Sequence, residues 1–152
     1  MFAMPAKADE VVKWRHVHHA ASNQSQQVGN GHILGVVRLP GIAFFSDGSI
    51  GTSLVIGTYD AVPGTGSTGG GYYSVTFADG SELWLTYTGE QKVIPPGRTV
   101  GKGTAIVIGG KGRYAEAKGE GTFETETSRF ISPPQVRRST TRQILPMVGR
   151  LI

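Results

Sequence analysis

The sequence predicts an all-β fold in which short antiparallel strands close into a barrel. Segments of alternating apolar and polar residues recur along the chain, Asp-Gly pairs separate some of them, and 23 of the 152 residues are glycine. Glycine without a strict triplet period is typical of turns, bulges and barrel corners. About seven or eight short strands without a long helix favour a barrel, because closure removes exposed strand edges.

The first strands carry their apolar residues on one side. In residues 10–20 the even positions share a face, which we expect to point inward: Val12, Trp14, His16 and His18. The polar, glycine-ended residues 21–31 read as a loop. Residues 31–39 alternate again and predict a second strand.

Two Asp-Gly pairs, Asp47-Gly48 and Asp79-Gly80, each lie between alternating runs. This pattern is a strong hairpin signal, and we expect type I′ turns, in which both central residues have positive φ. Residues 50–60 predict the strand after the first hairpin, and the glycine-rich residues 63–71 predict a flexible loop.

Two strands follow that loop with one apolar face each, over residues 71–78 and 82–90. Their inward sides hold Tyr73, Val75 and Phe77, and then Leu83, Leu85 and Tyr87. After a break at residues 95–98, residues 101–110 form a strand with bulky residues on both faces. We expect its outer face to be covered by the C-terminal tail or by a second subunit. Residues 113–119 are the single candidate for a short helix.

The basic charge of the chain lies at its end. Residues 1–128 hold ten Lys or Arg and eleven Asp or Glu, whereas residues 129–152 hold five Arg and no acid. A nucleic-acid-binding domain would carry its basic residues on the folded body, so we expect no nucleic-acid partner. We predict an extension at 1–9, one barrel domain at 10–132 and a basic tail at 133–152 that packs on the barrel or on a partner subunit.

The sequence also limits compartment and chemistry. It has no cysteine, which excludes disulfides and thiolate metal sites. It has no apolar run of about 20 residues for a membrane span and no signal peptide, which predicts a cytoplasmic protein without a membrane partner. Secretion or a periplasmic location stays open if a leader was removed.

His16 and His18 are the candidate catalytic residues, because an imidazole titrates near neutral pH and both share the inward face. Together with His32 they would also have the residue types of a metal site. The acid that a cupin site needs after the second histidine is absent, since Ser22 and Asn23 stand there. We therefore expect no metal and no cofactor. The alternative is that the histidines only line the barrel.

Four inward aromatic residues are the candidate ligand-binding wall: Trp14, Tyr73, Phe77 and Tyr87. Small-molecule pockets are mostly apolar with a few polar groups, and a buried tyrosine hydroxyl needs a partner that a ligand can supply. The alternative is that these rings fill the barrel as core.

Residues 101–126, GKGTAIVIGGKGRYAEAKGEGTFETE, resemble a signature of the allene oxide cyclase barrel superfamily, which includes dirigent proteins. The matching positions are Gly109, Gly110, Gly112, Arg113, Tyr114, Ala117, Gly119, Gly121 and Phe123. The resemblance implies an eight-stranded antiparallel calycin-like barrel with little helix, an apolar interior, and assembly into a homo-oligomer, a dimer or a trimer.

The function expected from this reading is binding of a small hydrophobic molecule in the barrel interior. A cofactor-independent cyclisation or isomerisation is the reaction that such a site would catalyse by confinement. The alternative is a non-catalytic ligand-binding, dirigent-like or assembly protein.

Overall fold

The computed structural model describes residues 10–95, 98–128 and 145–151, and nearly all of them lie in strands. The elements are β1 (Glu10–His18), β2 (Ser22–Gln27), η1 (Gly29–Gly31), β3 (Ile33–Phe45), β4 (Ile50–Val62), β5 (Gly66–Phe77), β6 (Glu82–Ile94), β7 (Arg98–Lys111), η2 (Gly112–Tyr114), β8 (Gly119–Ser128) and β9 (Leu145–Leu151). Among these residues no helix is long and apolar enough to cross a membrane. The all-β prediction is confirmed.

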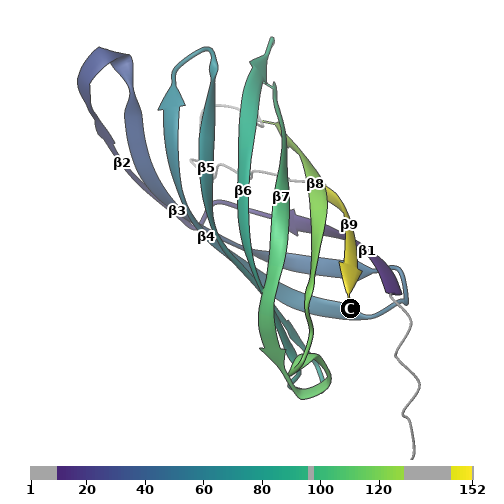
Figure 1. The fold of residues 1–152 in the computed structure, drawn as a ribbon. Helices are drawn as coiled ribbons and strands as arrows, with labels where there is room; N and C mark the ends of the chain where they lie inside the picture. Colours follow the sequence, from purple (N-terminus) through teal and green to yellow (C-terminus); the bar gives the residue numbers. More distant parts are fainter. Residues whose placement is uncertain (1–9, 96–97, 129–144, 152) are drawn as a thin grey trace, which may run out of the picture.

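The strands form one antiparallel sheet that closes through β1 (Figure 1). β1 pairs with β9 on one side and with β3 on the other, and β9, β8, β7, β6, β5, β4 and β3 follow one another around the ring. The predicted eight-stranded antiparallel barrel is therefore present. A ninth strand, β2, pairs with Ile33–Arg38 of β3, the part of β3 that does not pair with β1.

Closure is complete at one end of the barrel only. β8 pairs with β9 over Gly119–Phe123, while its pairing with β7 continues to Ser128. At the opposite edge, β2 pairs with β3 alone. Within the described ranges the sheet is thus a ring at the end that holds β1 and β9, and it spreads apart between β2 and the far part of β8 (Figure 1).

The structure corrects two of the predicted loops. Ser22–Gln27, expected to be part of a loop, is strand β2, and all six of its side chains are exposed. Because none of its side chains is buried, its sequence has no alternation of apolar and polar residues. It is a strand only through its backbone pairing with β3. The second loop, at 63–71, is confined to the turn before Gly66, where β5 begins. Gly64 lies in that turn, and the other four glycines of the segment are strand residues; a Cβ at Gly69 would meet the carbonyl oxygen of Thr58 on β4.

Both Asp-Gly hairpins exist, but their turns are not type I′. Only the glycines have positive φ, +85° at Gly48 and +79° at Gly80. Each aspartate instead accepts a hydrogen bond from the backbone N–H two residues later, Asp47 from Ser49 at 2.8 Å and Asp79 from Ser81 at 2.9 Å. The aspartate side chain holds the turn, and a single left-handed glycine completes it.

The structure also differs from the predictions for residues 113–119 and for the C-terminal tail. Residues 113–119 form no α-helix: they hold the end of the short 3-10 turn η2, a further turn at 115–116 and the first residue of β8, Gly119. The segment expected to pack outside the barrel contains β9, which lies within the sheet between β1 and β8. Residues 133–144 of that segment and the extension at 1–9 lie outside the described residues.

One continuous core of buried side chains lies in the closed part of the barrel. The inward faces predicted for β1, β5 and β6 are confirmed by burial. The buried apolar side chains are Trp14, Ala43, Phe45, Val55, Tyr73, Val75, Phe77, Leu83, Leu85, Ala105 and Phe123. Both buried histidines lie beside this core, which makes the interior of the ring the place to look for chemistry.

Candidate functional site in the barrel interior

β1 carries the polar part of the interior. Its alternation turns Trp14, His16 and His18 toward the core, where they are 5%, 1% and 1% exposed. The two imidazole rings lie 4.2 Å apart between centroids. Histidine is seldom buried so completely without a hydrogen-bond partner, so the groups that face these rings decide what the rings can do.

His16 is paired with a tyrosine from the far side of the ring. Its Nδ1 lies 2.9 Å from the hydroxyl oxygen of Tyr73 on β5. The tyrosine is 2% exposed, and its ring is 5.0 Å from the imidazole. Two candidate residues of different predicted classes, one catalytic and one ligand-binding, are thereby joined in a single buried contact.

His18 is paired with a serine that the sequence did not single out. Its Nε2 lies 2.9 Å from the hydroxyl oxygen of Ser53 on β4. The ring has room because Gly41, its neighbour on β3, has no side chain: a Cβ there would meet the imidazole and the carbonyl oxygen of Val17. The sequence feature that could have pointed to Ser53 is its inward position in β4, between Gly51 and Val55, because a polar residue is unusual on an inward face.

Burial controls the ionisation of this cluster. Desolvation holds the pKa of His16 well below its usual value of 6.5, and the nearby charge of His18 lowers it further. His16 is therefore neutral at neutral pH. Desolvation also raises the pKa of the Tyr73 hydroxyl far above 10, while Trp14 and Ser53 lower it by smaller amounts. Tyr73 stays protonated and can donate.

Two buried polar atoms of the cluster have no hydrogen-bond partner in the described part of the chain. They are Nε2 of His16 and the indole Nε1–H of Trp14. The indole N–H lies near enough to the hydroxyl of Tyr73 to lower its pKa slightly, but the two groups do not meet the geometry of a hydrogen bond. Most buried polar groups in folded proteins are satisfied, so these two atoms are the ones in the cluster to which a further polar group could bind.

The other two aromatic candidates have clear packing roles. Phe77 lies in a run of rings, 5.1 Å from Phe45 and 5.2 Å from Tyr114, and the guanidinium of Arg113 covers it at 4.4 Å. Tyr87 is half-buried and reaches over the backbone of Gly57, where a Cβ would meet its hydroxyl. Phe77 and Tyr87 therefore pack with the apolar core away from the histidines, while Trp14 and Tyr73 lie beside the histidines.

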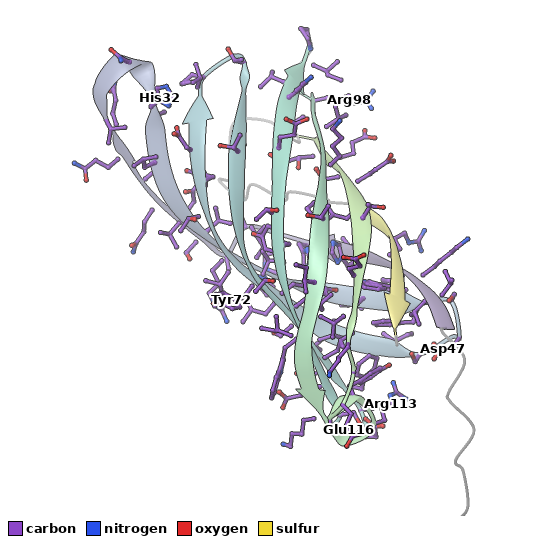
Figure 2. The ribbon with its side chains drawn as sticks, in the orientation of Figure 1. His32, Asp47, Tyr72, Arg98, Arg113 and Glu116 are labelled. Atoms are coloured by element: carbon purple, nitrogen blue, oxygen red, sulfur yellow. The ribbon has the colours of Figure 1, made fainter. Side chains whose placement is uncertain are left out.

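His32 does not join His16 and His18. It lies before β3 at the spread end of the sheet, and its Nδ1 is 2.6 Å from a carboxylate oxygen of Asp60 on β4. Figure 2 shows it at the opposite end of the molecule from Asp47 and Arg113. Among the described residues no group of three His, Cys, Asp or Glu side chains is placed to hold a metal ion. The three-histidine alternative is thereby not supported.

Comparison with known proteins gives a likeness in fold only. No family model and no curated protein matches the chain. A solved structure of a dirigent protein, described as a pterocarpan synthase, is similar over 97% of this chain and 88% of its own, with 12% sequence identity and a TM-score of 0.49. At that level of similarity nothing about ligand or reaction transfers to the present chain.

Proposed function

We propose that this protein binds a small, largely apolar molecule inside the barrel, with one polar group of that molecule placed against Trp14 and His16. The observation that carries the proposal is the pair of buried, unpartnered polar atoms on these two residues. The surroundings are apolar and aromatic, which is the usual composition of a small-molecule site with a few polar fixing groups.

The chemistry of the two atoms defines the polar group. The indole N–H is a donor only, so it takes an oxygen acceptor. His16 Nε2 accepts when Nδ1–H donates to Tyr73, and it donates when the tyrosine hydroxyl donates to Nδ1. A hydroxyl suits the first arrangement and a carbonyl suits the second. We therefore expect phenols, alcohols or ketones with an apolar body.

The two tryptophans allow a direct test, because Trp14 lies in the site and Trp84 is 38% exposed on the outer face. In a Trp84→Phe variant, the fluorescence of Trp14 reports on the interior alone. Titration with a panel of small phenols and cyclic ketones should give a saturable change in emission. The same titration of Trp14→Phe, which keeps Trp84, is the matched control and should give none.

His16→Phe removes the polar fixing group while keeping an aromatic ring. It should weaken the binding of a responsive compound by roughly tenfold or more, the expected effect of one lost buried hydrogen bond. Native mass spectrometry of protein purified from its own source should show a bound mass. The absence of both a bound mass and any saturable response would refute the proposal.

Catalysis without a cofactor is the second candidate, because Nε2 of His16 is buried without a hydrogen-bond partner among the described residues and the ring is kept neutral by burial. A neutral imidazole can take a proton from carbon next to a ligand carbonyl and return it to another carbon, which isomerises the ligand. His18, at 4.2 Å between ring centroids, would adjust the basicity of His16.

The test of catalysis is separate from the test of binding. Compounds that bind are incubated with the protein in D₂O and followed by NMR. Deuterium entering the compound, or a shifted double bond, should appear with the wild type and should be lost in His16→Gln. Binding without either change supports the non-catalytic alternative.

A further inference from the structure

The inner face of the sheet carries no charge at the spread end (Figure 1). There the register pairs place the odd-numbered residues of β2 to β8 on the inner side. Among the described residues, none of these positions holds Asp, Glu, Lys, Arg or His. The charged residues of the same strands lie on the outer side, where Arg98 pairs with Glu126 at 2.9 Å and Lys102 with Glu90 at 3.6 Å.

Hydroxyl and amide groups take the place of charges on this inner face. They can donate and accept hydrogen bonds, and they come from four different strands. One of them is also buried and unsatisfied: Thr125 is 8% exposed, and its Oγ1 has no hydrogen-bond partner in the described part of the chain. The polar side chains of the face are Asn23, Ser25, Gln27, Ser67, Gln91 and Thr125.

Three aromatic side chains of the same face lie along the sheet. Each of them reaches over a glycine of a neighbouring part of the sheet, where a Cβ would collide with its ring or its hydroxyl. The pairs are Tyr59 with Gly35, Tyr87 with Gly57, and Phe123 with Gly103. Because these glycines have no side chain, the rings lie against the backbone instead of standing into the interior, and Tyr59 and Tyr87 stay only half-buried.

Both tyrosine hydroxyls keep hydrogen-bonding capacity. The hydroxyl of Tyr59 donates to Oδ1 of Asn23 at 2.8 Å, which leaves the amide NH₂ of Asn23 for a second partner. Burial raises the pKa of Tyr87 to about 12, so its hydroxyl is protonated at neutral pH and can donate. The inner face of the spread end therefore combines two accessible aromatic rings with uncharged donors and acceptors.

We propose that this face binds a neutral oligosaccharide. The C–H groups on one side of a pyranose ring pack on the electron-rich face of a tyrosine, while the sugar hydroxyls pair with amides and hydroxyls. An ionic ligand would find no opposite charge here, and a purely apolar ligand would leave the polar side chains without partners.

The spacing of the tyrosines indicates the size of the ligand. Tyr59 on β4 and Tyr87 on β6 are two strands apart, roughly 10 Å, which is more than one sugar ring spans. We therefore expect a chain of several sugar units. This site is separate from the one proposed at Trp14 and His16, and neither proposal depends on the other.

Affinity electrophoresis and calorimetry of the full chain test the proposal. Native gels that contain a neutral glucan, xylan or mannan should retard the wild type in at least one case, and calorimetry with the matching soluble oligosaccharide gives its affinity. Tyr59→Ala should weaken binding about tenfold, whereas Tyr59→Phe keeps the ring and should stay within a few-fold of the wild type. Tyr72→Ala, on the outer face, is the control and should bind as the wild type does.

A charge introduced on either side of β5 provides a second comparison. Ser67→Glu puts a carboxylate on the uncharged inner face and should weaken binding, while Thr68→Glu puts it on the exposed outer face and should not. Far-ultraviolet circular dichroism checks that each variant is folded. Salt should leave the affinity of the wild type unchanged, because no ion pair is involved.

Three results would overturn the proposal. The first is a wild type that binds none of the neutral saccharides, which would leave the face to a peptide or to residues 129–144. The second is equal affinity in wild type, Tyr59→Ala and Ser67→Glu. The third is binding that is restricted to charged polysaccharides and is abolished by salt.

Discussion

The hydroxyl of Tyr73 on β5 lies 2.9 Å from Nδ1 of His16 on β1, although 57 residues separate them in the chain. Both side chains are almost completely buried, so the contact crosses the interior of the barrel. It unites the polar cluster with the apolar core, and the first prediction tests its contribution.

Tyr73→Phe should lower the free energy of unfolding by about 1–3 kcal/mol, because it leaves Nδ1 of His16 buried without a partner. Tyr72→Phe is the matched control: the same change is made one residue earlier, on the outer face, where the hydroxyl is exposed. It should change stability by less than about 0.5 kcal/mol. Urea unfolding followed by circular dichroism measures both. Equal effects would contradict a buried contact between His16 and Tyr73.

Stability should fall when the pH drops below about 6.5, the pKa of an unperturbed histidine. The pKa of His16 is lowered in the folded state, so the unfolded chain takes up its proton first, and protonation favours unfolding. The free energy of unfolding should decrease by up to about 1.4 kcal/mol per pH unit below that point. The hairpin carboxylates of Asp47 and Asp79 have lowered pKa values and contribute only in more acidic solution.

Urea unfolding at a series of pH values from 8 to 5 measures this slope. His16→Gln should flatten it, because glutamine does not titrate. His19→Gln alters the exposed neighbour of the buried pair and should leave the slope as it is in the wild type. A wild-type slope that persists in His16→Gln would show that another group is responsible.

Gly41→Ala should destabilise the fold by about 1–3 kcal/mol, the range for overpacking a closed interior. The added Cβ would meet the backbone oxygen of Val17 and the ring of His18, so β1 and β3 must move apart. Gly29→Ala is the control, since a Cβ there meets nothing within 4 Å. Thermal unfolding of both variants gives the comparison. A Gly41→Ala variant as stable as Gly29→Ala would mean that the His18 ring is not held over β3.

Arg113→Ala should lower stability by about 0.5–1 kcal/mol, the usual size of a partly exposed cation–π contact. Its guanidinium lies 4.4 Å from the ring of Phe77 and 5.0 Å from that of Tyr114, and it covers the end of the aromatic run. Arg15, whose guanidinium is 5.7 Å from Phe44, is the control, and Arg15→Ala should have a smaller effect. Chemical unfolding of the two variants measures both effects, and an equal loss of stability in the two would contradict a specific role for Arg113.

Local patterns were sufficient for most of the strands. Alternation in β1, β5 and β6 predicted which side chains face inward, since a strand turns successive residues to opposite faces. The Asp-Gly pairs predicted two hairpins. The same reasoning missed β2 and the start of β5, where polar or glycine-rich residues become strands because a neighbouring backbone offers hydrogen bonds.

The sequence by itself determined that the chain folds into antiparallel strands and that Trp14, His16 and His18 share one inward face. It could not determine what those residues meet. That was decided by closure of the sheet through β1, which brings Tyr73 to His16 and Ser53 to His18 and inserts β9 beside β1. Periodicity depends on neighbours along the chain, whereas contacts across a barrel depend on strand register, and only the tertiary structure sets that register.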